Sequence, residues 1–307
     1  MKKIAFLLAG CLLVSLTACR RDLPNAGGTT DRPVLSGVYN LPEEQFSIGS
    51  SFSCWPVNLQ KAPGGGYLLP GGPVQIAVEA NNKYNRADPY YLMILADGLP
   101  VEFSVEGEKY LHYPITLTPS GTAFTAELVP EFSVNLGRLD VFLLYDGDPL
   151  ASTFTSVFTM HFAVEGKPLA PDTLQPTVAR DVGGYGGSIC DAWLRGPNGG
   201  AVQQRIITIR DGETVWFHGL STETGLYRTV LVVNGAPVIF TLDGEEYAWL
   251  DWQSTGANML RLPITLPHIP DNSRFYAIFT PIGESVVKRS IELSASSLIN
   301  ETLATAE

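Results

Sequence analysis

The sequence contains little cysteine and few basic residues, and both shortages limit what the protein can be. Four cysteines occur among 307 residues, and only Cys54 and Cys190 lie beyond the first nineteen positions. The chain is therefore not a disulfide-stabilised scaffold. Lys and Arg number 20 against 31 Asp and Glu, which gives a net charge of −11. Because such an acidic chain repels polyanions, we expect no nucleic-acid partner.

The sequence also lacks the short motifs of common enzymes and cofactor sites. It has no His-Glu-x-x-His, Cys-x-x-Cys, Gly-x-Ser-x-Gly or phosphate-binding Gly-Lys-Ser/Thr pattern. The glycine-rich run at 183–187 lacks the lysine of a nucleotide-binding loop and is interpreted as a linker. Adjacent acids such as Glu245 and Glu246 remain the alternative as an acid–base pair, although such neighbours usually point apart into water. We expect no catalysis and no cofactor.

One loop carries two closely spaced carboxylates, in the sequence Asp146-Gly147-Asp148 after an expected strand. Carboxylate oxygens are the ligands that calcium prefers. Asp and Gly also favour turns for backbone reasons alone, and a plain turn is the preferred interpretation of Asp146 and Asp148. We therefore expect no metal site.

The first eighteen residues have the layout of a secretory signal peptide. Lys2 and Lys3 precede an apolar stretch from Ile4 to Leu16, which is shorter than the roughly twenty residues of a membrane-spanning helix. The sequence Leu16-Thr17-Ala18-Cys19 then resembles the bacterial lipobox. That resemblance implies a diacylglycerol group on the Cys19 sulfur and cleavage before it, and an ordinary signal peptide with an incidental Cys19 is the alternative.

Lipidation would make the bilayer a partner of the chain through Cys19. More than one acyl chain is needed for firm anchoring, and lipoproteins of this type carry three. Arg20 is not the Asp that typically retains a lipoprotein at the inner membrane, so an outer-membrane address is favoured in a Gram-negative host. Loss of residues 1–18 removes two lysines, and 18 basic against 31 acidic residues leaves a net charge of −13.

An internal repeat organises the remainder of the chain. The segment 96–110 reappears as 233–247 at a constant offset of 137 residues, and Asp97-Gly98 in the first copy matches Asn234-Gly235 in the second. These dipeptides favour the type I′ turn of a two-residue hairpin. The alternation of Val101, Phe103 and Val105 with polar residues predicts a strand with one buried face. Further strands are expected at about 73–80, 89–96, 123–129, 138–145 and 155–164, with counterparts at about 213–218, 226–233, 258–265, 274–280 and 286–293.

The pattern predicts an all-β protein with two tandem antiparallel β-sandwiches related by duplication. The architecture resembles the immunoglobulin-like and transthyretin-like sandwiches of bacterial surface proteins, without the paired cysteines of antibody domains. The expected parts follow the chain in order: signal peptide 1–18, lipidated tether 19–45, first sandwich 46–165, linker 166–187, second sandwich 188–293 and polar tail 294–307.

Two sets of residues are candidates for a function. Cys54 and Cys190 occupy equivalent positions in the two copies and could form a disulfide if the copies meet about a twofold axis, but two buried unpaired thiols are preferred. The aromatic segments after the hairpins could form an exposed binding shelf, or they could cap the two cores. These segments contribute Tyr110, His112 and Tyr113 in the first copy and Tyr247, Trp249 and Trp252 in the second.

These observations together predict a non-enzymatic envelope lipoprotein that binds or positions an extracellular protein or glycan. A structural role as a fimbrial or assembly subunit is the second interpretation, and a hydrolase is the third. A missing or donated strand would favour assembly, whereas closed sandwiches with an exposed aromatic shelf would favour binding of a ligand.

Overall fold

The computed structural model describes the protein over twelve segments, and every one of them belongs to a compact unit that spans Glu43–Glu307. The described segments are 51–63, 65–81, 87–118, 123–130, 136–147, 156–162, 170–179, 191–195, 206–221, 223–270, 273–283 and 292–300. Cys19, Asp148 and Cys190 lie outside the described residues.

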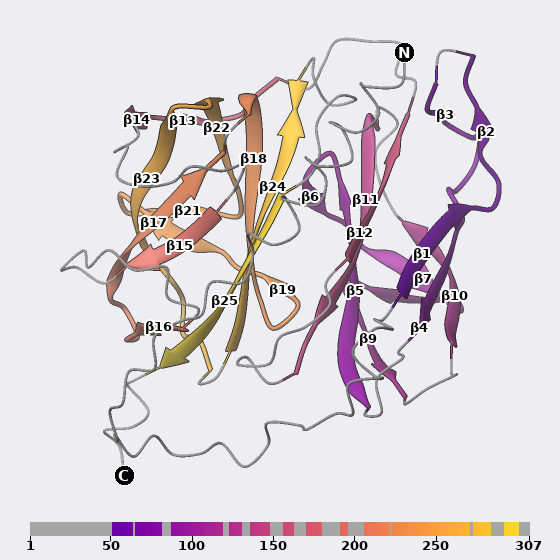
Figure 1. Ribbon diagram of the computed structural model, residues 1–307, viewed down its shortest axis with the longest axis horizontal. Coiled ribbons are helices and arrows are strands. Elements are labelled where there is room, and N and C mark those ends of the chain that lie inside the picture. Colours follow the sequence, from indigo (N-terminus) through magenta and orange to yellow (C-terminus); the bar gives the residue numbers. More distant parts are fainter. Residues whose placement is uncertain are drawn as a thin grey trace, which may run out of the picture. The chain divides into compact units, whose positions relative to one another are not determined.

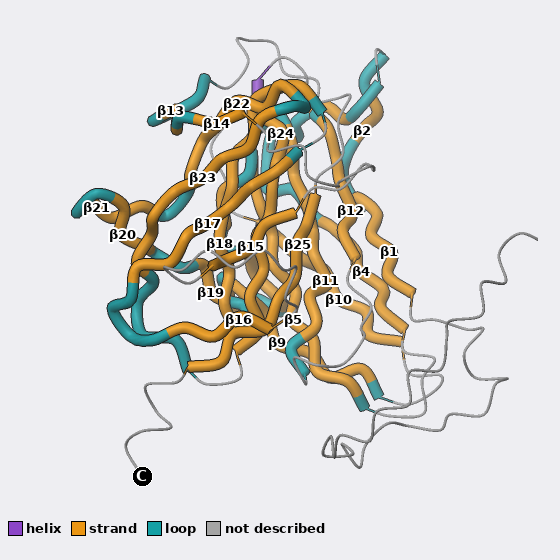
Figure 2. The backbone as a smooth tube through the Cα atoms, turned by 60° about the vertical axis from the view of Figure 1, so that its left-hand side comes forward, coloured by secondary structure: helices purple, strands orange, loops and turns teal. Residues whose placement is uncertain are grey.

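Apart from one 3-10 residue at Gly283, the described chain consists of strands and the loops between them (Figure 2). No α-helix occurs in these segments, and none of their residues forms a helix with the length and apolarity to cross a bilayer. The expected all-β class is therefore confirmed.

The first half of the unit, residues 51–162, forms two antiparallel sheets. The first sheet has the order β1-β4-β10-β7-β8, and the second has the order β12-β11-β5-β6 with β9 also paired to β5. A small hairpin of β2 and β3 stands beside them. The strands are β1 (Ser51–Pro56), β2 (Gln60–Lys61), β3 (Tyr67–Leu68), β4 (Ile76–Asn81), β5 (Asp88–Ala96), β6 (Leu99–Pro100), β7 (Phe103–Val105), β8 (Glu108–Tyr110), β9 (His112–Leu117), β10 (Ala123–Pro130), β11 (Arg138–Tyr145) and β12 (Ser156–His161).

The second half, residues 170–300, repeats this arrangement (Figure 1). Its first sheet has the order β15-β17-β23-β20-β21 with β14 paired to β23, and its second runs β13-β22-β18-β24-β25-β16 with β19 paired to β18. The strands are β13 (Leu174–Gln175), β14 (Thr177–Ala179), β15 (Asp191–Arg195), β16 (Ile206–Ile209), β17 (Thr214–Leu220), β18 (Thr224–Val233), β19 (Ala236–Pro237), β20 (Phe240–Leu242), β21 (Glu245–Tyr247), β22 (Leu250–Thr255), β23 (Asn258–Thr265), β24 (Ser273–Ile282) and β25 (Glu292–Asn300).

The order of strands in each half is that of an immunoglobulin-type sandwich. In that fold one sheet has the order A-B-E-D and the other the order G-F-C. The strands β1-β4-β10-β7 and β12-β11-β5 match these two sheets in the first half, and β15-β17-β23-β20 and β25-β24-β18 match them in the second. Even the parallel contact at the last strand recurs, as the bridge of Tyr67 with Phe162 and as the pairing of β16 with β25.

The strand beside β5 is interrupted by a short excursion. Both β6 and β9 are antiparallel to β5, and they pair with its opposite ends. Between them the chain crosses to the other sheet, where β7 pairs with β10 and turns back through β8. The second half makes the same detour between β19 and β22. This detour places each aromatic segment at the edge of its sandwich.

The predicted hairpin turns are present in both halves. Asp97 and Gly98 have φ values of 48° and 80°, and Asn234 and Gly235 have 47° and 84°, as a type I′ turn requires. Each turn is fixed to the neighbouring strand by the same contact, because the backbone N–H of Arg138 donates to Asp97 Oδ1 (2.8 Å) and that of Arg274 donates to Asn234 Oδ1 (2.8 Å). A second pair of turns at 106–107 and 243–244, which the sequence did not predict, has similar positive φ values.

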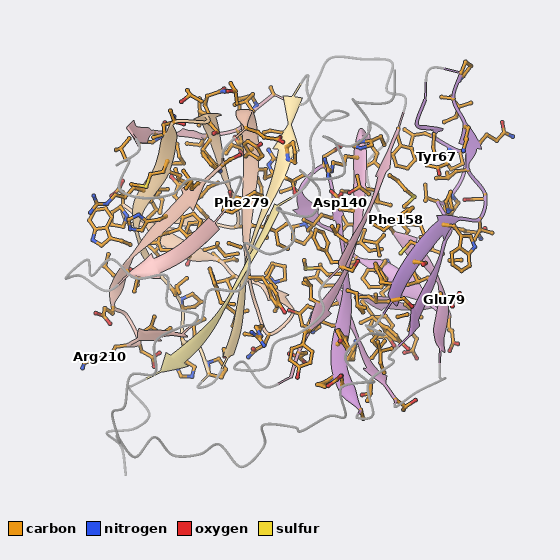
Figure 3. All side chains as sticks on the ribbon, in the orientation of Figure 1. Tyr67, Glu79, Asp140, Phe158, Arg210 and Phe279 are labelled. Atoms are coloured by element: carbon orange, nitrogen blue, oxygen red, sulfur yellow. The ribbon has the colours of Figure 1, made fainter. Side chains whose placement is uncertain are left out.

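Each half has its own hydrophobic core between its two sheets. The inward positions predicted from alternation are filled as expected, with Phe103 and Phe240 both at most 1% exposed. Figure 3 labels Phe279 of β24, which belongs to the second of these cores. The two halves thus bury equivalent faces of equivalent strands.

A third cluster of buried side chains joins the two halves. Met93 and Phe142 of the first half pack in it with Val230 and Ile278 of the second. All of these residues lie on β5, β11, β18 and β24, which are the C and F strands of the two sandwiches. Because successive side chains of a strand point to opposite faces, these strands bury one face in their own core and the other against the partner half.

Two expected boundaries differ from the structure. The polar tail expected from Ser294 begins inside β25, because this segment pairs with the edge of β24 along Glu292–Leu298. Part of the expected linker 166–187 also belongs to the second sandwich, where β13 and β14 pair with β22 and β23. In both places pairing with an available sheet edge outweighs a weak local preference for strand.

Candidate functional site

The aromatic segment of the second half lines a cavity of about 400 Å³. Such a volume lies within the range of small-molecule sites. The β20–β21 hairpin, which stands out from the sandwich in Figure 2, supplies part of its wall. The remaining wall comes from the start of β22 and from the segment just before β13. The lining residues are Asp172, Thr173, Ile239, Glu246, Tyr247, Ala248, Trp249 and Asp251.

The indole ring of Trp249 packs against a buried ion pair. The guanidinium of Arg228 lies 5.5 Å from the centre of the indole ring, within the range of a cation–π contact. Arg228 Nε and Nη2 donate to the two carboxylate oxygens of Asp251 at 2.8 and 2.7 Å. Trp249 also packs on the cluster between the two halves, so its position depends on both of them.

The segment before β13 is tied to the same carboxylate. The backbone N–H of Asp172 donates to Asp251 Oδ2 at 2.8 Å, while Leu174 and Gln175 pair in parallel with β22. Both oxygens of Asp251 are therefore occupied by donors from the protein. The carboxylates of Asp172 and Glu246, in contrast, belong to exposed residues and can accept hydrogen bonds from a ligand.

Tyr247 presents its ring from the hairpin. One face stacks on Phe240 at 6.3 Å and 21°, and the hydroxyl donates to Glu245 Oε2 at 3.2 Å. Partial desolvation and this bond to Glu245 raise the pKa of Tyr247, so the phenol is neutral at physiological pH. The ring is thereby held in a fixed orientation at the cavity wall.

Trp252 is not part of this surface, and its inclusion among the candidate binding residues was wrong. Its side chain is 0% exposed, lies 5.5 Å from the ring of Tyr227, and donates from Nε1 to Thr229 Oγ1 at 2.9 Å. Trp249 lies directly before β22 and Trp252 lies within it, and an odd spacing of three positions along extended chain directs side chains to opposite faces. The core interpretation therefore holds for Trp252 and not for Trp249.

The aromatic set of the first half is packed differently. The rings of Tyr110 and Tyr113 meet edge to face at 4.9 Å, and both pack against the core of their own sandwich. The ring of His112 lies 6.1 Å from that of Tyr91. All three side chains are partly buried, so this segment packs at the edge of the hydrophobic core.

The structure describes one member of each of the metal and disulfide candidates, Asp146 and Cys54. No cluster of three or more His, Cys, Asp or Glu side chains suited to a metal occurs within the described segments, which include Asp146 and not Asp148. Cys54 is a free thiol at 5% exposure, and burial raises its pKa to about 12. The halves meet through β5, β11, β18 and β24, whereas Cys54 lies on β1 in the opposite sheet.

Sequence reasoning missed several contributors to the cavity, among them Asp251, Asp172, Ile239 and Arg228. Asp172 lay in the expected linker at 166–187. Ile239 lay at an outward position of the predicted strand after the second hairpin, and Arg228 lay within the predicted strand at about 226–233. Ile239 carried a signal that could have been used, because an apolar side chain at an outward position is 55% exposed in the structure. Asp172 and Arg228 carried no comparable signal, since pairing across the sheet brings them to Asp251.

The comparisons with known proteins give little further information. No family model and no curated protein matches the sequence. Among solved structures, red sea bream transglutaminase is 10% identical over 82% of this chain and 31% of its own, with a TM-score of 0.23. The alpha-2-macroglobulin of E. coli is 10% identical over 84% and 17%, with a TM-score of 0.20. An anti-sigma factor domain-containing protein from Clostridium clariflavum is 13% identical over 73% and 80%, with a TM-score of 0.17.

The chain thus spans less than a third of the length of the first two of these proteins. The class of protein is defined by the strand order described above: an all-β protein of two immunoglobulin-like sandwiches.

Proposed function

We propose that the protein is a non-enzymatic lipoprotein of the bacterial envelope that binds an extracellular ligand in the cavity beside Trp249. The leader and Cys19 supply the anchor, and the compact unit of Glu43–Glu307 supplies the binding body. An outer-membrane location is proposed for a Gram-negative host. The ligand is a glycan or a segment of another protein.

The observation that supports binding is the coincidence of an aromatic segment with a cavity. Tyr247 and Trp249 were selected from the sequence, and both line the cavity that the fold forms. Aromatic side chains offer a large contact area at low entropic cost, and they dominate the binding energy of many interfaces. Trp249 is in addition held by Arg228 and Asp251, so its orientation is set before a ligand arrives.

The sandwiches themselves favour binding over a role in fibre assembly. Assembly by strand donation needs an open position in a sheet. In both halves the described strands fill all seven positions of the immunoglobulin-type order, including the last strands β12 and β25. The aromatic cavity is then the feature that remains to be explained.

The binding proposal is tested with the chain from Asp22 onward, which retains the whole compact unit. Glycan-array and pull-down screening should identify a ligand, and Trp249→Ala should abolish the signal. Tyr110→Ala changes the first-half counterpart of Tyr247 and should leave it intact. Equal binding by both variants would show that the cavity is not the site.

The anchor is tested separately in cells. Cys19→Ser should release the protein from the membrane fraction or leave an uncleaved precursor, and it should abolish incorporation of labelled palmitate. Labelling of the Cys19→Ser protein would contradict lipidation at this position.

A further inference from the structure

We infer that the cavity beside Trp249 recognises an uncharged sugar ring. This inference rests on the proposed binding function and makes it specific. It follows from three properties of the cavity: which hydrogen-bonding groups are free, what already occupies the indole ring, and which charges surround the opening.

The free charged groups of the cavity are acceptors of hydrogen bonds, while Thr173 and Trp249 add a hydroxyl and an indole N–H that can donate. The carboxylates of Asp172 and Glu246 belong to exposed residues, and none of the described lining residues is Lys, Arg or His. Asp251 is saturated by Arg228 and by the backbone N–H of Asp172. A ligand that satisfies these carboxylates must therefore bring donors, and the hydroxyl groups of a sugar donate without charge and can also accept from Thr173 and Trp249.

A ligand cation could also satisfy carboxylates, but the indole ring is already engaged by one. Arg228 lies 5.5 Å from the ring centre of Trp249 and has 4% of its surface exposed, so it is a fixed part of the site. A positive charge at the ring reduces the attraction of its π-electrons for a second cation. Stacking by the C–H face of a sugar has no such conflict.

An anionic ligand is disfavoured by the charges at the opening. Asp172 and Glu246 line the cavity, and Asp243 and Glu245 are exposed on the hairpin that forms its wall. Among the described residues, the guanidinium that contacts Trp249 is that of Arg228, and it is paired with Asp251. Uronic acids, sialic acids and phosphate esters would therefore meet uncompensated like charge.

The first half shows that this combination is not a general property of the sandwich. At the positions of Ile239, Glu246 and Trp249 it has Glu102, Lys109 and His112. The counterpart segment of the first half therefore lacks the aliphatic wall and the indole ring.

The test uses sugars that share one ring and differ in charge. Binding of glucose, glucuronate and glucosamine to the chain from Asp22 onward is measured by titration calorimetry and by tryptophan fluorescence. The galactose and mannose series are measured in the same way, so that the result does not depend on one epimer. We expect one uncharged series to bind, and its uronate to bind about fivefold to tenfold more weakly because like charges repel at the opening.

Ile239→Glu tests the site without disturbing a core, because Ile239 is 55% exposed and its first-half counterpart is an acid. It should weaken binding of the uncharged sugar at least tenfold, whereas Val57→Glu changes a side chain that is 54% exposed in the first half and should not. Thermal unfolding checks that both variants remain folded.

Tighter binding of the amino sugar or of the uronate than of the parent sugar would overturn the inference. Failure of every uncharged sugar to bind would also overturn it. If a protein captured in pull-downs still requires Trp249, the proposed binding function survives that failure. If nothing that binds the chain responds to Ile239→Glu or Trp249→Ala, both proposals fail.

Discussion

The two halves of the protein share one backbone plan and differ in the side chains placed on it. Tyr91 and Arg228 occupy the same position 137 residues apart, on β5 and β18. Each of them contacts the hairpin glycine of the other half, since Gly98 lies against Arg228 and Gly235 lies against Tyr91. The contacts between the halves therefore follow an approximate twofold relation.

That relation shows how a duplicated fold can acquire one binding site. In the second half Arg228 reaches both Asp251 and the indole of Trp249, while in the first half Tyr91 packs beside His112. The hydroxyl of Tyr276 also donates to the backbone oxygen of Tyr145 across the junction, at 2.8 Å. The halves support each other, and the cavity lies on one of them.

The largest expected effects come from the two buried ion pairs. Arg138 with Asp140, which Figure 3 labels, belongs to the first half, and Arg228 with Asp251 belongs to the second. All four side chains are at most 5% exposed. Removing one partner leaves an uncompensated buried charge, so Asp140→Ala and Asp251→Ala should each lower the free energy of unfolding by about 3–5 kcal/mol in urea titrations.

The same two variants should differ in binding. Asp251→Ala releases both Arg228 and the backbone of Asp172 at the cavity, whereas Asp140 bonds to Arg138 and Thr159 away from it. A loss of ligand binding confined to Asp251→Ala would support the asymmetry of the halves. Equal losses in both folded variants would contradict it.

The hairpin glycines provide a graded test of the junction. All four glycines at the turns have positive φ, so replacement by Ala should cost about 1–2 kcal/mol at any of them. A Cβ at Gly98 would lie 3.0 Å from Thr280 Cβ, and one at Gly235 would lie 3.2 Å from the Tyr91 ring, whereas Gly107 and Gly244 have open space. Gly98→Ala and Gly235→Ala should therefore be more destabilising than Gly107→Ala and Gly244→Ala.

Chemical unfolding of the four variants measures this difference directly. Equal losses of unfolding free energy at all four positions would mean that the turns at Gly98 and Gly235 do not pack against the other half in solution.

The smallest expected effect concerns Cys54. Burial raises its pKa from 9.0 to about 12, so the folded protein keeps the thiol proton where the unfolded chain loses it. The stability that this difference contributes is present below pH 9 and declines as the pH rises toward 12. Between pH 9 and 10 the free energy of unfolding should fall by up to about 1 kcal/mol more in the native chain than in Cys54→Ala.

Labelling provides the control for this prediction. A thiol reagent at pH 7 should modify Cys54 only when the protein unfolds, because the thiol is buried and protonated. Rapid labelling of Cys54 itself in the folded protein, measured in a Cys190→Ser background so that Cys190 does not contribute, would contradict the placement of Cys54 in the core.

Most of the strand pattern could be predicted because it depends on local chemistry. The turn at Asp97-Gly98 needs two residues that tolerate positive φ, and the strand at 138–145 was expected and observed at the same positions. Of the expected strand at 286–293 the structure describes only the last two positions, which begin β25 (Glu292–Asn300), and β25 continues well past the expected end because it pairs with β24. Edge pairing depends on a partner that is distant in the sequence.

The candidate site was only half predictable. The odd spacing of Trp249 and Trp252 implied opposite faces, and the structure places Trp252 in the core and Trp249, directly before β22, at the cavity. The register between β22 and β18 decides which of the two side chains points into the core. No local sequence pattern specifies that register. One signal of the junction was present, since the nearly continuous apolar run of β5 is typical of a strand buried on both faces.

The sequence by itself determined the two hairpins, the period of the strands and the duplication, because turn chemistry and alternation act between near neighbours. Only the tertiary structure decided that the C and F strands of the two halves cover each other, and that Asp172, Arg228 and Asp251 meet behind Trp249. The physical reason is that burial of a second sheet face, and of an ion pair beside it, requires residues far apart in the chain to exclude water together.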